Sequence, residues 1–279
     1  MIDRFVLLIG AMKAGTTTLF ELLAQHPQIA PCRDKEPDFL AERERWRQGL
    51  AEYSRLWDWQ PGRHRYALEA STKYTKLPAF PSAAIATSRY AFDHHARFRF
   101  IYLVRHPIAR LRSEYLHSMA AGWIREPIEL RIAPHAVMHS NYHLQLHPYV
   151  VAHGRESIAV VTFDELKRDP AGLTQRLWRW LELDERAAPL PVGKANAGEN
   201  HRERLLQRLL PRCGGDRAAA LREVERAVTP SAEQAAAIRR LLERDLAAFR
   251  DDWGIDPWAL QGDREGRTAG EPAPREQGA

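Results

Sequence analysis

Cysteine is scarce in this chain of 279 residues, which contains only Cys32 and Cys213. Two thiols form at most one disulfide and cannot supply the framework that small secreted domains use in place of a large core. Long hydrophobic runs are lacking too, because the apolar segment 5–9 is far too short for a signal-peptide core or a membrane span. These absences lead us to expect a cytoplasmic protein with two free thiols and no membrane span.

A dense basic run is also lacking, although the formal net charge is +5 and the sequence pI about 9.3. The excess is modest and spread along the chain, so it fits an anionic ligand and does not indicate a nucleic-acid partner. Histidine and cysteine form no cluster, since His94 and His95 are neighbours expected to face different ways, and no metal site is predicted. Hydrophobic residues make up 44% of the chain, which is enough for a sizeable core.

Short apolar segments alternate with helical patterns along the chain. Helix 107–121 begins with Pro107 at its first position and is expected to end at Gly122. Residues 31–65 are predicted to form a loop and then one or two helices that cover the site. Strands are predicted at residues 5–9, 65–70, 98–104 and 157–162, helices at 17–25 and 140–152 and from Asp169 onward, and a loop at 189–200.

The last helix is predicted to begin at a capping box formed by Ser231 and Gln234. Residues 261–279 contain no large apolar side chain, so we expect a disordered tail after one domain of residues 1–260. The apolar side chains that the last helix is expected to bury are Ile238, Leu241, Leu242 and Phe249.

Strands that alternate with helices favour an α/β fold, here a P-loop-like three-layer domain with a central, mostly parallel sheet flanked by helices. Ligands bind such sheets beyond the C-terminal ends of the strands. Three loops leave predicted strands at that edge, at residues 10–16, 71–75 and 105–107. We therefore expect these loops to converge on one site.

Residues 10–18, with the sequence GAMKAGTTT, follow the first predicted strand and open the first helix. A loop that closes on a helix N-terminus presents free backbone N–H groups and the positive end of the helix dipole to an anion. Lys13 adds a full charge, and the threonines add hydroxyl donors. The segment is predicted to bind phosphate through Lys13, Ala14, Gly15, Thr16, Thr17 and Thr18.

The loop differs from the Walker A loop of kinases, which reads G-x-x-x-x-G-K-[ST]. Thr16 stands where that motif has lysine, and the lysine of this chain is Lys13, inside the loop. From there it can reach a 5′-phosphate and the group attached to it. A nucleoside or small-molecule kinase remains an alternative, as does a nucleotide-binding module without catalysis.

A second anion site is predicted at the end of strand 98–104. Arg105 follows that strand, and Ser113 lies eight residues further on, about two helical turns into the next helix. An arginine fork and a hydroxyl group form a good phosphate clamp.

Together these motifs resemble the sulfotransferases that use 3′-phosphoadenosine 5′-phosphosulfate (PAPS), in particular the bacterial and Golgi-type branch with the heparan sulfate enzymes. Residues 13–17 (KAGTT) are similar to the family's 5′-phosphosulfate loop, and Arg105 and Ser113 to its 3′-phosphate site. Residues 35–39 (KEPDF) resemble an acceptor-side segment. Residues 164–166 and 246–260 also resemble the family, so the likeness covers residues 4–260.

The resemblance implies sulfuryl transfer from PAPS to a hydroxyl group of a carbohydrate, lipid, natural product or peptide, with 3′,5′-ADP as the other product. Lys13 is expected to stabilise the leaving 5′-phosphate oxygen, and Glu36 to act as the general base. Lys194 and Asn196 lie where the family often folds a segment over the nucleotide. No metal is needed for this reaction.

Other residues compete for the role of base, namely Glu69, Asp38 and His106. Glu69 ends the second predicted strand, so its side chain is also expected to point toward the site. His106 precedes a helix-starting proline and is better explained by capping or packing. Heparan-type enzymes carry a lysine directly after the glutamate that matches Glu69, whereas this chain has Ala70 there and its next lysine at Lys73. This difference weakens a prediction of a glycosaminoglycan acceptor.

Some aromatic and helical positions allow two interpretations. These residues either line an acceptor cleft or match a family motif, or they simply pack in the hydrophobic core. They are Trp46, Trp57 and Trp59, and Tyr142, Gln145 and Leu146.

Overall fold

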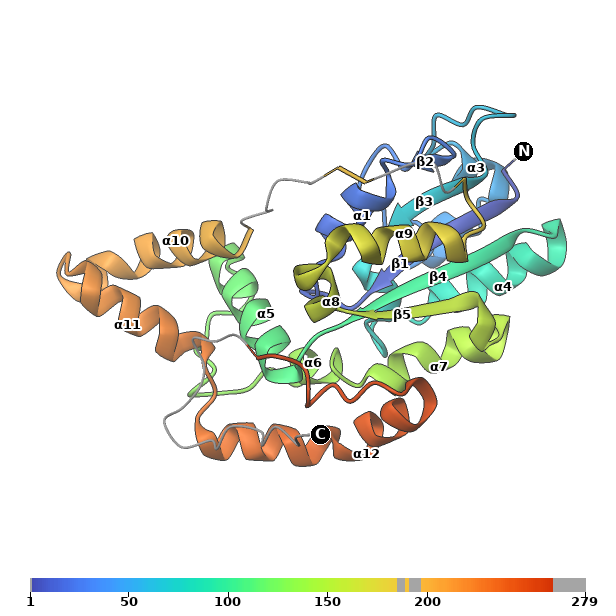
Figure 1. Ribbon diagram of the computed structural model, residues 1–279. Helices are drawn as coiled ribbons and strands as arrows, with labels where there is room; N and C mark the ends of the chain where they lie inside the picture. Colours follow the sequence, from blue (N-terminus) through green and yellow to red (C-terminus); the bar gives the residue numbers. More distant parts are fainter. Residues whose placement is uncertain (1, 185–188, 191–196, 263–279) are drawn as a thin grey trace, which may run out of the picture.

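The computed structural model describes residues 2–184, 189–190 and 197–262. Its centre is a five-stranded sheet in the order β2-β3-β1-β4-β5, with every neighbouring pair parallel. The predicted α/β fold with a central parallel sheet is therefore confirmed (Figure 1). The strands are β1 (Arg4–Gly10), β2 (Ile29–Pro31), β3 (Tyr66–Ala70), β4 (Arg97–Val104) and β5 (Ile158–Thr162).

Strand β2 is the one strand of this sheet that the sequence patterns did not predict. It has 3 residues and lies at the edge beside β3. So short a segment shows no period, and its last residue is Pro31, which only an edge strand accommodates easily.

Helices cover both faces of the sheet. α1 (Thr16–Leu23) packs against α9 (Pro170–Trp180), which follows the short α8 (Phe163–Arg168). α7 (Tyr142–His153) packs against α4 (Ser82–His94) and α12 (Ala232–Trp253), and Figure 1 shows this second group on the other side of the sheet. Because both faces are covered, inner strands carry continuous apolar runs, and β1 is buried over its last six residues.

Beyond the C-terminal ends of the strands, α5 (Pro107–Ala121) packs against α10 (Ala197–Leu209) and α11 (Arg217–Val228) (Figure 1). The short η3 (Leu210–Cys213) connects α10 to α11. The prediction of a loop through residue 200 is wrong at its end, because α10 begins at Ala197. Burial of Leu205 and Leu206 stabilises this helix although two residues of its first turn, Gly198 and Asn200, are weak helix formers.

Helix α12 begins at the predicted capping box. The Ser231 hydroxyl accepts a hydrogen bond from the Gln234 N–H at 3.1 Å, and the Gln234 side chain accepts one from the Ser231 N–H at 2.9 Å. Ile238, Leu242 and Phe249 are buried as predicted, but the prediction for Leu241 is wrong, because it is 71% exposed. Leu241 lies about 100° around the helix from Leu242 and therefore off the buried stripe.

Shorter elements complete the fold. They are α2 (Arg43–Trp46), α3 (Leu50–Ser54), η1 (Thr72–Thr75), α6 (Pro134–Met138) and η2 (Arg155–Ser157). α2 and α3 are the helices expected in segment 31–65. Both cysteines are free, as predicted. Among the described residues, no helix has the length and apolar character required to cross a membrane.

Candidate functional site

The phosphate loop joins β1 to α1, as the sequence predicts. Gly15 occupies the N-cap position of α1 with φ 95°, and no side chain caps the helix, so the first N–H groups of α1 are available to an anion. A Cβ atom on Gly15 would approach Phe163 and Leu166 of α8 to 2.9 Å. Glycine is therefore required both by the positive φ and by the close contact with α8.

Hydrogen bonds join the loops at this edge of the sheet. Arg105, which follows β4, donates from Nη1 to the carbonyl oxygen of Lys13 at 2.9 Å. Thr75 of η1 donates to the carbonyl oxygen of Ile9 at 2.6 Å, and the Ser71 N–H donates to Leu8 at 3.2 Å. The predicted convergence of loops 10–16, 71–75 and 105–107 is therefore confirmed.

Arg105 is held from several directions. It is 8% exposed, and its guanidinium lies over the Phe163 ring at 4.6 Å from the centroid. The Tyr142 hydroxyl donates to the Arg105 carbonyl oxygen at 2.7 Å. Ser113 lies half-buried on α5, and no direct hydrogen bond joins it to Arg105 within the described part of the chain.

Lys13 lies in the phosphate loop with a left-handed backbone, at φ 67°. Burial lowers the pKa of its ammonium, and neighbouring Arg105 lowers it further, while Glu36 and Glu114 act in the opposite direction. A half-buried cation between two carboxylates interacts more strongly with a ligand charge than an exposed lysine does. Lys13 is thus placed to act on charge that develops in the loop.

Glu36 lies at the rim of the site. Its N–H donates to the carbonyl oxygen of Ala70 at the end of β3 at 2.8 Å, and its backbone is left-handed, at φ 61°. The carboxylate pairs with Lys35 at 2.7 Å, and the Glu36 side chain is 39% exposed. The pair with Lys35 is the contact expected of an exposed loop carboxylate without a catalytic role. Glu36 nevertheless also raises the pKa of Lys13, so it lies close enough to the phosphate loop to interact with it electrostatically.

Glu69 is enclosed in the core instead of pointing into the site. Its side chain has no exposed surface and accepts hydrogen bonds from the hydroxyl groups of Tyr53, Ser71 and Tyr74. Burial raises the pKa of its carboxyl group, and the three hydrogen bonds oppose that shift. A group so enclosed is poorly placed to take a proton from a bound acceptor, so the expectation that Glu69 faces the site is wrong.

Asp38 and two lysines that follow β3, Lys73 and Lys76, are further charged residues near Glu36. Lys73 pairs with Asp38 at 2.8 Å and lies over the Phe80 ring, and these contacts hold its ammonium group away from the phosphate loop. Lys76 was missed by the sequence reasoning. Burial lowers the pKa of its ammonium, and the carboxylates of Glu114, Glu36 and Asp38 oppose that shift. Lys76, not Lys73, is therefore the second lysine that shares carboxylate neighbours with Lys13.

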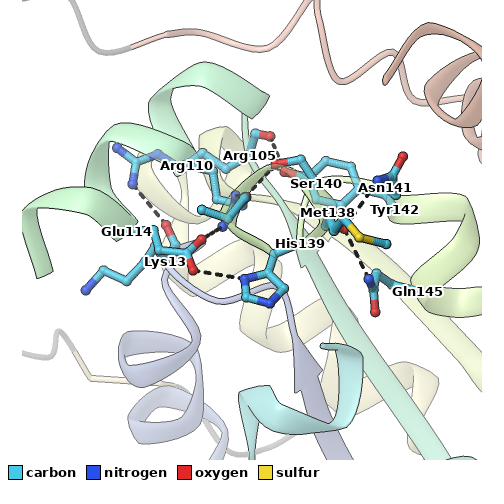
Figure 2. A network of polar contacts seen from close by, with 11 residues as sticks. Lys13, Arg105, Arg110, Glu114, Met138, His139, Ser140, Asn141, Tyr142 and Gln145 are labelled. Carbon is cyan, nitrogen blue, oxygen red and sulfur yellow. Dashed lines mark hydrogen bonds and ion pairs between the residues drawn. The ribbon is translucent and has the colours of Figure 1, made fainter. Parts of the chain in front are cut away.

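A buried polar network that the sequence did not indicate lies beside Lys13 (Figure 2). Glu114 of α5 receives Nη1 of Arg110 at 2.6 Å and is paired with Nδ1 of His139 at 2.9 Å. Nε of Arg110 donates to the Ser140 hydroxyl at 2.6 Å. Burial favours the neutral acid, but Arg110 and the hydrogen bond from His139 lower the pKa of Glu114 to about 2. Glu114 is therefore a carboxylate at neutral pH.

Two further histidines meet where α10 packs on α5. Nδ1 of His117 and Nε2 of His201 are 2.9 Å apart. Burial lowers the pKa of His117 to about 4, and Lys13 acts in the same direction. His106, one rival for the role of base, packs edge-on against Trp258 with ring centroids 5.4 Å apart. No three His, Cys, Asp or Glu side chains are grouped as metal ligands in the described ranges.

Several sequence candidates belong to the core. Nε1 of Trp57 donates to the Leu68 carbonyl oxygen at 3.0 Å, and its ring packs edge-on against Tyr53. Trp46 and Trp59 are partly buried against the same core. The three positions on α7, Tyr142, Gln145 and Leu146, are buried. Lys194 and Asn196 lie outside the described residues.

The fold and the site define a class: an α/β domain in which a glycine-bearing loop, a lysine and an arginine meet at a helix N-terminus. The protein-family model for the sulfotransferase domain matches residues 3–192. The chain therefore belongs to the sulfotransferase domain family, and it is an enzyme of that class.

Several solved structures are similar to this chain. A sulfotransferase from Alicyclobacillus acidocaldarius is 22% identical, with a TM-score of 0.56 over 90% of this chain and all of that chain, and it shows the same fold. The sulfotransferase domain of the Synechococcus PCC 7002 olefin synthase is 16% identical, with a TM-score of 0.43 over 66% of this chain and 74% of that one. Mouse sulfotransferase SULT7A1, complexed with PAP, is 13% identical, with a TM-score of 0.47 over 88% and 86%.

Proposed function

We propose that this sulfotransferase binds PAPS with its adenosine 5′-phosphosulfate in the loop before α1 and its 3′-phosphate beside Arg105 and Ser113. The observation that carries the proposal is the hydrogen bond from Arg105 to the Lys13 carbonyl oxygen, because it joins the two predicted anion sites. The free N–H groups at the start of α1 and the glycine at its N-cap fit a phosphate group.

The donor contacts follow from this placement. Lys13, with the backbone of Ala14 and Gly15 and the hydroxyls of Thr16, Thr17 and Thr18, contacts the 5′-phosphosulfate. Lys194 and Asn196 are proposed from the family resemblance to contact the 3′-phosphate or the adenine.

The chemistry is an in-line transfer, in which catalysis is mainly positioning and charge stabilisation. The acceptor oxygen forms a bond to sulfur while the bond from sulfur to the 5′-phosphate oxygen breaks. Lys13 stabilises the charge that grows on that leaving oxygen. Glu36 takes the proton of the acceptor hydroxyl, so that the products are a sulfate ester and 3′,5′-ADP.

The acceptor is a hydroxyl compound, proposed from the family resemblance to be a carbohydrate, lipid, natural product or peptide. Residues 35–39 support a place near the bacterial and Golgi-type branch. Ala70, in the position where heparan-type enzymes have lysine, opposes a glycosaminoglycan acceptor. Lys76 is half-buried among the same carboxylates as Lys13 and is the nearest replacement for that lysine.

Calorimetric titration with 3′,5′-ADP, 5′-AMP and ATP tests the donor assignment. We expect 3′,5′-ADP to bind most tightly, because loss of the charge-assisted contacts at Arg105 costs on the order of 2–5 kcal/mol. Equal affinity for 3′,5′-ADP and 5′-AMP would remove the basis for the 3′-phosphate site, and preference for ATP would favour a kinase. Incubation with labelled PAPS and host extracts, followed by identification of the labelled product, then reports the acceptor.

A further inference from the structure

His139 lies beside the site, and its imidazole has no role in the proposed transfer. It lies between α6 and α7, and its Nδ1 is 2.9 Å from Oε1 of Glu114. The other carboxylate oxygen of Glu114 is held by Nη1 of Arg110 at 2.6 Å. Two residues of α5, Glu114 directly and Arg110 through Glu114, therefore fix the orientation of this imidazole (Figure 2).

The contacts also decide which ring nitrogen carries the proton. Glu114 is a carboxylate and only accepts, so Nδ1 of His139 must donate. In a neutral imidazole, Nε2 then carries a lone pair. Burial lowers the pKa of His139, although Glu114 opposes the shift, so the neutral form is favoured at neutral pH. Within the part of the chain that the structure describes, no group is hydrogen-bonded to Nε2.

The position of His139 connects it with both sides of the site. Figure 2 shows the Glu114 carboxylate between Lys13 and the His139 ring. Lys76, from the segment after η1, also acts electrostatically on His139. The side chain is 9% exposed, so a small part of the ring is accessible while the rest is packed. A hydrogen-bond acceptor that is packed in this way discriminates between the ligand groups that reach it.

We propose that Nε2 of His139 accepts a hydrogen bond from a second hydroxyl group of the acceptor substrate, adjacent to the hydroxyl that is sulfated, and that this enzyme therefore selects vicinal diols. The proposal rests on the proposed function, in which Glu36 takes the proton of the reacting hydroxyl. A lone pair in a desolvated site favours a hydroxyl donor and rejects an ether or a carboxylate at the same place. Sugars and catechols share this chemistry.

Matched acceptor pairs test the selection. Transfer from PAPS is measured to catechol and phenol, and to methyl β-glucopyranoside and its 2,4-dideoxy analogue, which has no vicinal diol. We expect the diol of the pair to have a KM lower by roughly 3- to 10-fold, as one neutral hydrogen bond allows. A lower KM in the catechol pair indicates an aromatic acceptor, and a lower KM in the glucoside pair indicates a sugar acceptor.

Variants assign the difference to His139. His139→Leu should abolish the preference for the diol with little change in kcat, and His139→Gln, whose side-chain oxygen can accept, should retain part of it. His147→Leu is the matched control, because His147 is an exposed histidine of α7 whose ring packs against His143 and not against His139. Binding of 3′,5′-ADP verifies that each variant is folded. A preference that survives in His139→Leu overturns the proposal.

The pH profile separates this role from a purely structural one. The charged and titratable groups that face His139 are Glu114 and Arg110 of α5, His135 of α6 and Lys76 after η1. Protonation of Nε2 should raise the KM for the diol as the pH falls, with kcat less affected, and the His139→Gln profile should lack this rise. A wild-type KM that is independent of pH would count against the proposal.

Imidazole nitrogen NMR gives a readout that does not depend on turnover. In the complex with 3′,5′-ADP we expect a protonated Nδ1, an unprotonated Nε2 and a shift of the Nε2 resonance when catechol or the glucoside is added. A protonated Nε2 at pH 7, or a resonance that neither diol moves, contradicts the inference. If 3′,5′-ADP itself fails to bind, the proposed function fails, whereas the tautomer result for His139 stands.

Discussion

The donor side and the acceptor side of this site are built in different ways. On the donor side, the loop before α1 and the end of β4 are joined through the backbone by the hydrogen bond from Arg105 to Lys13. On the proposed acceptor side, Glu36, Lys76 and His139 come from three segments, and their proposed roles depend on their side chains. The proposed donor site is thus built from contiguous motifs, whereas the proposed acceptor site is built from residues that only the packing brings together.

The largest expected effect is on the acceptor side. Glu36→Gln keeps the size of the side chain but cannot take the acceptor proton, so kcat should fall by roughly 10²–10⁴-fold. Affinity for 3′,5′-ADP, measured by calorimetry, should change little because Glu36 is proposed to contact the acceptor and not the donor. Glu44→Gln, an exposed glutamate of α2, is the control. An active Glu36→Gln enzyme would pass the role of base to Asp38 or His106.

Glu114 lies where the two sides meet, and Glu114→Gln should mainly affect stability. The substitution leaves the guanidinium of Arg110, which has no exposed surface, without its charge partner. The free energy of unfolding in urea should fall by about 3–5 kcal/mol. Glu203→Gln removes an exposed pair with Arg217 and should have little effect. A similar decrease in the free energy of unfolding in both variants would mean that the buried pair of Arg110 and Glu114 contributes no more to stability than an exposed pair.

Lys13→Ala tests the donor side. Removal of one preorganised cation from the leaving oxygen should lower turnover by roughly 10²-fold. The free energy of unfolding should stay near the wild-type value, since Lys13 lies in a loop and makes no ion pair within 4 Å among the described residues. Arg240→Ala on the exposed face of α12 is the control. Near-normal turnover would make Lys13 a surface lysine.

The smallest effect concerns acid stability far from the site. His153 packs against Phe98 and Phe100 near the start of β4, and burial lowers its pKa to about 4. Between pH 6.5 and 4 the unfolded chain therefore binds a proton that the folded chain does not, so stability falls as the pH falls. We expect roughly 1–2 kcal/mol from this group after allowance for its partial exposure.

Urea unfolding of wild type and His153→Gln across this pH range measures the contribution. The variant should show a weaker loss of stability at low pH. Turnover at pH 5 should decline equally in both proteins if the decline comes from the acceptor side. A decline that disappears in His153→Gln would attribute it to unfolding instead.

Much of the fold could be predicted because the signals are local. Continuous apolar segments gave four of the five strands, and the capping box at Ser231 and Gln234 placed the start of α12. The predictions were wrong or missing where a segment has no such local signal or where contacts with distant parts of the chain determine its structure. β2 is too short to show a period, the start of α10 depends on packing against α5, and the exposure of Leu241 depends on which stripe of α12 meets the domain.

The sequence by itself determined that the fold is α/β with a mostly parallel sheet, and that residues 10–18 form a loop between a strand and a helix, because a strand, a glycine turn and a helix start are contiguous in the chain. Only the tertiary structure decided that Glu69 is enclosed by three hydroxyl groups, that Lys76 shares the carboxylate neighbours of Lys13, and that His139 meets Glu114 across 25 residues. The reason is physical: hydrogen bonding and burial depend on distances between side chains, and for segments far apart in the chain those distances are set by how the helices pack on the sheet.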